Sequence, residues 1–130
     1  MKKRVTGIGG IFFKSKDPAA TKNWYSKHLG LNTDQWGSTF WWKDAEGKDC
    51  STQWSPMGED TQYYKPSEKP FMINYRVENL EELLETLKAE GVEVVGEMES
   101  HSYGKFGWVM DPEGNKIELW QPIDKAFLEQ

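Results

Sequence analysis

An internal repeat is the feature that most constrains the fold of this chain. A turn-forming segment, Asp111 to Asn115, leads into the apolar stretch 116–122, and a similar segment, Asp44 to Lys48, leads into a stretch closed by Trp54-Ser55-Pro56. The two copies lie about 65 residues apart, and such a repeat indicates one supersecondary unit used twice. It also pairs positions between the halves, so each candidate site residue has a counterpart for comparison.

The first half contains one helix signal and several strand signals. Residues 5–13 are apolar and rich in strand-forming residues, and Asp17-Pro18 has the pattern of a helix N-cap followed by proline at the first helical position. Gly30 is a typical helix end. The pattern predicts a β-α-β-β-β order, with the helix at 19–29 and the later strands at 31–36, 39–42 and 49–54.

The second half repeats this order. Asn79 and Glu82 form a capping box, and Leu80, Leu83, Leu84 and Leu87 share one helical face. We therefore predict an α+β fold in one domain, residues 1–130. Its parts are module 1 (about 5–56), a linker (about 57–69), module 2 (about 70–122, with strands at 71–77, from 92–95, at 106–110 and at 116–120) and a tail (123–130) with a possible short helix.

Charge and cysteine content restrict the function classes. The net charge of −5 argues against a general nucleic-acid or anionic-membrane binder. Cys50 is the single cysteine, which favours a reducing compartment. The sequence has no apolar run of about 18 residues for a membrane span and no secretory signal pattern. We expect a cytoplasmic protein.

Two stretches carry a family resemblance. Residues 11–18 with Trp24-Tyr25 and 28–31, and residues 103–120 at the other end, resemble the vicinal-oxygen-chelate superfamily, which includes glyoxalase I, bleomycin-resistance proteins and extradiol dioxygenases. The resemblance implies two tandem βαβββ modules whose curved sheets form a cup around a small-molecule site, usually in a homodimer. The superfamily hosts many chemistries, so it does not fix an activity.

The resemblance also locates the positions that hold a metal in metal-using relatives. These are Gly10, Thr52 (or Gln53), Met72 and Glu118. Only Glu118 is a typical ligand, so we expect no metal and no other cofactor. For Glu118 three interpretations stay open: a carboxylate kept for solvation or hydrogen bonding, a general base or polar anchor for ligand, or one ligand of a metal completed by other donors.

Side-chain alternation along the strands predicts the lining of the cup. His101, in the loop before the last hairpin, is a further candidate for ligand contact or acid–base catalysis; the alternative is an ordinary exposed loop residue. The alternative for the aromatic side chains is that they fill the sheet interior, and Trp41 could replace Trp42. The predicted ligand-binding residues are Phe12, Trp42, Thr52, Trp54, Met72, Asn74 and Trp120.

These residues support several functional hypotheses. The first is a glyoxalase-like, metal-independent protein that binds a flat or apolar small molecule, with the substrate unassigned. The second is a lyase or isomerase of glyoxalase type that uses Glu118, with His101, for proton transfer. The others are a ligand-sequestering protein like the bleomycin-resistance proteins and a metalloenzyme with unexpected donors. The expected partners are a small molecule and a second copy of the chain, not nucleic acid or a membrane.

Overall fold

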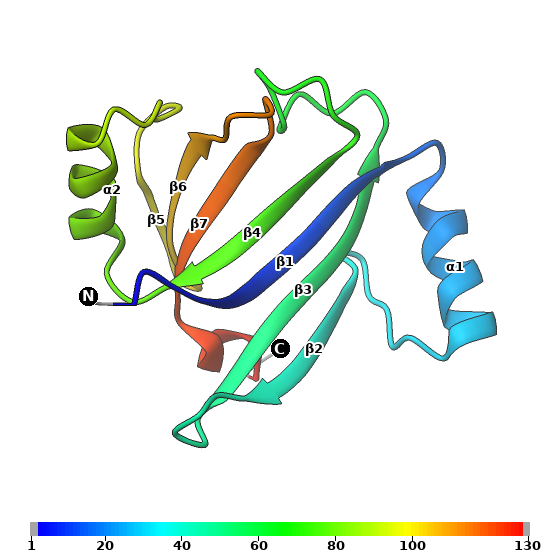
Figure 1. Cartoon of the computed structure of the whole chain (residues 1–130). Coiled ribbons are helices and arrows are strands. Elements are labelled where there is room, and N and C mark those ends of the chain that lie inside the picture. The colour runs from blue at the N-terminus through cyan, green and yellow to red at the C-terminus, as the bar shows by residue number, and fades with distance from the viewer. Residues whose placement is uncertain (1–2, 129–130) are drawn as a thin grey trace.

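One seven-stranded mixed sheet forms the framework of the protein. The computed structural model describes residues 3–128. The strands lie in the order β2-β3-β1-β4-β7-β6-β5, and the sheet is strongly curved without closing on itself (Figure 1). The strands are β1 (Val5–Ser15), β2 (Ser38–Lys43), β3 (Asp49–Gly58), β4 (Phe71–Val77), β5 (Glu99–His101), β6 (Gly104–Met110) and β7 (Lys116–Pro122). This architecture confirms the predicted α+β class with a curved sheet.

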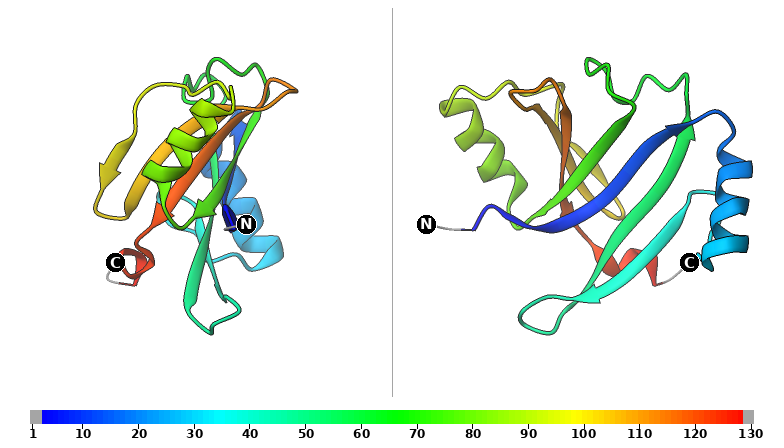
Figure 2. Two further views of the ribbon diagram at one scale, coloured as in Figure 1. Left: turned by 60° about the vertical axis from the view of Figure 1, so that its left-hand side comes forward. Right: turned by 45° about the vertical axis from the view of Figure 1, so that its right-hand side comes forward.

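The two halves of the chain meet along the centre of this sheet. β1 pairs antiparallel with β4, while β1 pairs parallel with β3 and β4 pairs parallel with β7. The halves therefore form a continuous sheet within a single chain. Helices α1 (Pro18–Leu29) and α2 (Leu80–Ala89) lie at opposite ends of the sheet in Figure 1 and in the right-hand view of Figure 2.

The strand predicted at residues 31–36 is wrong, and the first half has three strands. The Asp34 carboxylate accepts hydrogen bonds from the backbone N–H groups of Trp36 and Gly37, at 2.8 and 3.0 Å. Lys22, on α1, donates to the carbonyl oxygens of Asp34 and Gln35. Side-chain bonds of this kind compete with a strand ladder, so the segment forms a loop.

The strand predicted from residues 92–95 is also displaced. Val94 forms only an isolated bridge with Val109, and the regular strand is β5, a few residues later. Gly96 lies between them with a φ of 70°, which turns the chain out of the extended conformation. The segment therefore runs beside β6 without becoming a full strand.

The two helices differ in how much of their side-chain surface is buried. The Asn79 side chain caps α2, which packs Leu80, Leu83 and Leu84 into a core with strands β4, β6 and β7. Asp17 caps α1 as predicted, but α1 has no fully buried residue, and Trp24 is 53% exposed. Helix α2 therefore anchors the fold, and α1 is a lightly packed outer element.

The linker and the tail are both attached to the sheet. Tyr64, in the linker, is buried in a cluster with Met72 and Trp108. The tail begins with a short 3₁₀ helix, η1 (Asp124–Phe127), and Glu129 and Gln130 lie outside the described residues. No helix in the described part of the chain is long and apolar enough to cross a membrane.

Candidate functional site

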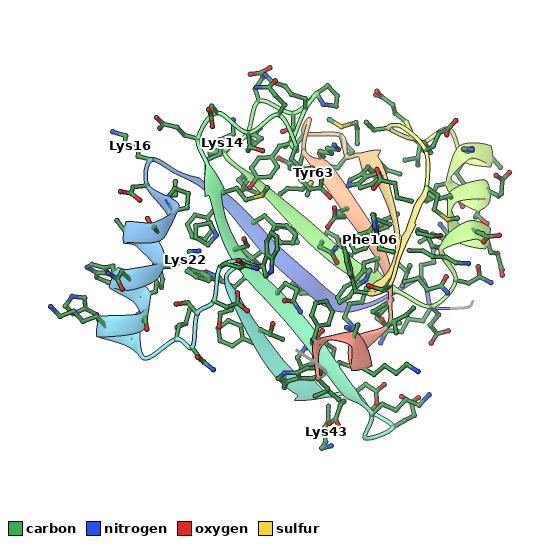
Figure 3. The ribbon with its side chains drawn as sticks, turned by 180° about the vertical axis from the view of Figure 1, so that it is seen from behind. Lys14, Lys16, Lys22, Lys43, Tyr63 and Phe106 are labelled. Carbon is green, nitrogen blue, oxygen red and sulfur yellow. The ribbon has the colours of Figure 1, made fainter. Side chains whose placement is uncertain are left out.

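A cavity of about 700 Å³ lies on the face of the sheet opposite to the α2 core. Alternation along β7 defines this face, because Leu119 joins the α2 core while Glu118 and Trp120 border the cavity. Figure 3 shows Tyr63, from the linker, and Phe106, from β6, over the same region of the sheet; both border the cavity. The loop at 34–39, the loop at 99–103 and η1 complete the walls.

A line of side chains crosses the sheet beneath this cavity, and we call it the polar row. Its members are consecutive partners in strand pairing from β2 to β6: Thr39, Gln53, Gly10, Asn74, Glu118 and Trp108. The hydroxyl of Thr39 donates to Oε1 of Gln53 at 2.9 Å, and Nδ2 of Asn74 donates to Oε1 of Glu118 at 2.7 Å. Nε1 of Trp108 donates to Oε2 of Glu118 at 2.9 Å.

Glu118 is the most enclosed functional group of the site. Its side chain is 2% exposed, and it accepts hydrogen bonds from Asn74, from Trp108 and from the hydroxyl of Tyr63. These donors come from β4, β6 and the linker. Burial, together with the neighbouring Glu118 carboxylate, raises the pKa of Tyr63 well above its usual range, so the phenol remains a donor at neutral pH.

The linker backbone is fixed to the same group of residues. Nζ of Lys116 donates to the carbonyl oxygen of Tyr63 at 2.7 Å and lies over the rings of Tyr63 and Trp108, at 5.4 and 5.5 Å from their centroids. With Tyr64 buried next to Tyr63, the linker is a fixed wall of the site. The sequence predicted only a linker here, because the contact with Glu118 joins residues 55 positions apart.

Several predicted site residues border the cavity. Phe12, Asn74, Glu118, His101 and Trp120 all do so. His101 lies at the rim, with Nε2 at 3.0 Å from Oε1 of Glu99 and its ring stacked on Tyr103, rather than beside Glu118.

Trp54 also borders the cavity, but its ring packs on the α1 side. The ring lies 4.7 Å from the ring of Tyr25 and 5.5 Å from that of Phe13. The reason is register: Trp54 is opposite Ile11, on the face away from Phe12. Trp54 therefore belongs to the cavity lining, while its ring packs against Tyr25 and Phe13 rather than beside Trp120.

Two predicted contacts, Met72 and Thr52, do not line the cavity. Met72 is fully buried in the core beside Tyr64. The hydroxyl of Thr52 donates to the carbonyl oxygen of Ile8 and accepts a hydrogen bond from Nε1 of Trp42. Gln53, the alternative to Thr52, takes the cavity position.

The two candidate tryptophans of β2, Trp41 and Trp42, also lie outside the cavity lining. The Trp42 ring packs 5.4 Å from the guanidinium of Arg76, and neither Trp41 nor Trp42 borders the cavity. Other aromatic residues border the cavity instead. Most come from loops and η1, where no strand period marks them, and Phe106 comes from β6. They are Trp36, Tyr63, Tyr103, Phe106 and Phe127.

The comparisons with known proteins place the chain in a family. The model of the Glyoxalase/Bleomycin resistance protein/Dioxygenase superfamily matches residues 7–119, and the chain belongs to this superfamily. No functionally curated protein matches the sequence.

Solved structures of similar fold belong to proteins of different activity. Methylmalonyl-CoA epimerase from Mycobacterium tuberculosis has a TM-score of 0.64 at 20% identity, covering 98% of this chain and 95% of that chain. A variant of the Streptomyces coelicolor epimerase in complex with 2-nitronate-propionyl-CoA has a TM-score of 0.68 at 16% identity, covering 92% of this chain and 99% of that chain. The Mn(II)-bound glyoxalase from Novosphingobium aromaticivorans has a TM-score of 0.63 at 21% identity, covering 91% of this chain and 39% of that chain. At these identities the likeness defines the fold alone.

The residues at the family's metal positions do not fit a divalent ion in this chain. Gly10 has no side chain, Met72 is in the core, and the Thr52 hydroxyl is occupied. Oε1 of Gln53, the alternative to Thr52, accepts a hydrogen bond from Thr39. The remaining Glu118 faces N–H and O–H donors, whose positive ends oppose a cation. Within residues 3–128, no three His, Cys, Asp or Glu side chains are grouped so that they could hold a metal.

Proposed function

We propose that this protein binds a small, flat molecule in the aromatic cavity without a metal ion. The carrying observation is the set of donors around Glu118, since Tyr63, Asn74 and Trp108 together occupy its carboxylate. In this arrangement Glu118 holds the cavity wall in place and gives it negative charge.

The charge of the cavity favours a neutral or cationic ligand. The charged side chains that border it are Asp34, Glu99 and Glu118, and no lysine or arginine is among its lining residues. A ligand with several phosphates would be repelled by these carboxylates and would find no cation there. The CoA ester in the solved Streptomyces epimerase complex is such a ligand, so we propose a different ligand class for this protein.

The aromatic rings favour a flat ligand. Phe106 lies nearly parallel to Trp120, with an angle of 11° between the planes and 5.9 Å between the centroids. At the rim, His101 and Tyr103 are stacked with an angle of 3°, and Trp36 is 69% exposed beside the opening. Trp36 and Tyr103, which is 39% exposed, offer ring surface at the cavity, and such surface is suited to stacking on a planar molecule.

A second candidate function is a lyase or isomerase reaction of glyoxalase type, with Glu118 as the base. The observation that favours it is the hydrogen bond between Tyr63 and Glu118 at the cavity wall. A substrate C–H or O–H proton could pass to the phenol oxygen while the phenol proton passes to Glu118. A sequestering role, as in bleomycin-resistance proteins, would use the same cavity without this step.

Titration with matched flat probes tests the binding proposal. Tryptophan fluorescence is followed while 2-naphthylamidine (cationic), 2-naphthamide (neutral) and 2-naphthoate (anionic) are added, with EDTA present throughout. We expect the cation and the neutral probe to bind and the anion to bind at least about ten-fold more weakly, as one repulsive charge contact of about 1.4 kcal/mol implies. Equal binding of 2-naphthoate, or binding only when Mn²⁺ replaces EDTA, would refute the proposal.

Variants locate the binding and separate the two candidate functions. Phe106→Ala should weaken binding of the neutral probe. Trp24→Ala, on the exposed side of α1, should leave this binding unchanged. Once a turned-over substrate is found, Tyr63→Phe and Glu118→Gln should abolish turnover while the ligand still binds, if Glu118 is the base. Unchanged turnover in both variants would contradict that role.

The homodimer and the cytoplasmic location stay predictions. Light scattering would test the homodimer.

A further inference from the structure

The polar row is interrupted at Gly10. On one side of this residue, Nε2 of Gln53 is buried without a hydrogen-bond partner, and on the other side, Oδ1 of Asn74 is buried without one. The first atom is a donor and the second an acceptor, so the break leaves a complementary pair. Buried polar atoms are nearly always paired in folded proteins, and two unpaired atoms flanking one strand position require an explanation.

The neighbours of each amide fix its orientation. Nδ2 of Asn74 points to Glu118 on β7, so its carbonyl oxygen turns to β1 and lies over Gly9, where a Cβ atom would be only 2.2 Å away. Oε1 of Gln53 is occupied by Thr39 on β2, which leaves its NH₂ group unpaired. The backbones of β3 and β4 are two strand spacings apart, roughly 10 Å, with only glycines of β1 between them.

An aromatic ring covers this break. A Cβ atom on Gly10 would lie 2.7 Å from Cζ of Phe12, so the Phe12 ring occupies the space that a side chain at position 10 would take. Phe12, Gln53, Asn74 and Gly9 all border the cavity. If the Phe12 ring rotates about χ1, the cavity extends onto the two unpaired amide atoms, while the glycines still leave room for a ligand group.

We propose that the break in the polar row is a subsite for an uncharged group that both accepts and donates a hydrogen bond, such as a carboxamide or a ring lactam. Its oxygen accepts from Nε2 of Gln53, its N–H donates to Oδ1 of Asn74, and its ring stacks in the aromatic cavity. A carboxylate has no proton for Asn74 and is repelled by Glu118, and an amidinium has no acceptor for Gln53. The inference rests on the proposed binding function and narrows its ligand to the neutral class.

Three probes of equal shape test the subsite: benzamide, benzoate and benzamidinium. The side-chain NH₂ signals of Gln53 and Asn74 in ¹H–¹⁵N NMR spectra report on the break itself, and backbone signals around the cavity give the dissociation constants. We expect benzamide to shift the Gln53 NH₂ signal and to bind about five-fold more tightly than either charged probe, the usual net effect of one to two added hydrogen bonds. Equal or tighter binding of benzoate or benzamidinium would overturn the subsite.

Two variants give the test a matched control. Gln53→Met removes the donor at similar side-chain length and should abolish the preference for benzamide. Gln35→Met makes the same change at an exposed residue that does not border the cavity, so the preference should remain. A preference retained in Gln53→Met overturns the subsite. If that variant does not fold, the wild-type NH₂ shift decides.

The outcomes separate this inference from the binding proposal. Probes that bind around Phe106 and Trp120 without any preference overturn the subsite and leave the aromatic cavity as a binding site. Probes that shift no signal around the cavity overturn both.

Discussion

Removal of the Asp124 carboxylate should be one of the most destabilising single changes in this protein. Asp124, the first residue of η1, accepts two hydrogen bonds from the guanidinium of Arg76, both at 2.7 Å, and two from Ser51, from its backbone N–H at 2.9 Å and its hydroxyl at 2.8 Å. The guanidinium lies between the rings of Trp42 and Trp120, 5.4 Å from each. Asp124→Ala would leave a buried cation without its counter-charge.

The magnitude follows from the burial of the pair. Breaking a buried ion pair by removing one partner costs about 3–5 kcal/mol, because the other charge stays buried and unpaired. The side chain of Asp124 is 17% exposed, and η1 is short, so water can partly replace the carboxylate. We therefore expect a loss of about 3 kcal/mol, which corresponds to a fall of about 2 M in the urea midpoint at an m-value of about 1.5 kcal/mol/M.

The effect should depend on pH in a defined direction. Burial opposes ionisation of Asp124, but the hydrogen bonds from Arg76 and Ser51 and the guanidinium charge outweigh it and lower its pKa below the ordinary value. A lowered carboxyl pKa contributes stability that is present above the unfolded-state pKa, about 4, and is lost as the pH falls through the folded-state value. The difference between wild type and Asp124→Ala should therefore be full at pH 7 and shrink below about pH 4.

Urea unfolding followed by tryptophan fluorescence is a suitable assay, since Trp42 and Trp120 flank the Arg76 guanidinium. Asp49→Ala is the control, because Asp49 pairs with Lys43 at a similar distance, 2.8 Å, on the surface, and its removal should leave the midpoint unchanged. A loss below about 0.5 kcal/mol for Asp124→Ala, or a difference that stays constant down to acidic pH, would refute the reasoning.

Three further predictions concern individual contacts. Gly9→Ala should lower the free energy of unfolding by about 2 kcal/mol, because its Cβ would lie 2.2 Å from Oδ1 of Asn74 and 2.8 Å from Cε3 of Trp120; an unchanged melting temperature would contradict this clash. Tyr64→Phe removes a buried hydroxyl that has no partner, so calorimetry should show equal stability or a gain of up to about 1 kcal/mol, whereas a clear loss would reveal a partner. Neither Mn²⁺ nor EDTA should shift the melting temperature, since Glu118 is occupied by donors, and a metal-dependent rise would show a bound ion.

Local signals predicted much of the fold. Asp17 and Asn79 cap their helices, and Gly30 ends the first helix with a φ of 73°. The leucine face of α2 is buried against the second half of the sheet. Such features depend on residues that are close in sequence, so a single sequence contains them. The failures at 31–36 and 92–95 also have local causes, in the Asp34 side-chain bonds and at Gly96.

The site was harder to predict from the sequence than the fold was. Alternation correctly placed Phe12, Asn74 and Glu118 on one face, because they lie on regular parts of β1, β4 and β7. Trp54 also borders the cavity, but the packing of its ring against Tyr25 follows from its pairing with Ile11, and a shift of one residue in register reverses the face of a strand residue.

The sequence by itself determined the superfamily and the α+β class, since both depend on residue identity and local spacing. Only the tertiary structure decided what surrounds Glu118. Tyr63 comes from the linker, Asn74 from β4 and Trp108 from β6, and their hydrogen bonds form across strands that pair only after the chain has folded. The break at Gly10 has the same origin, because unpaired amide atoms appear only when six strands align into one row.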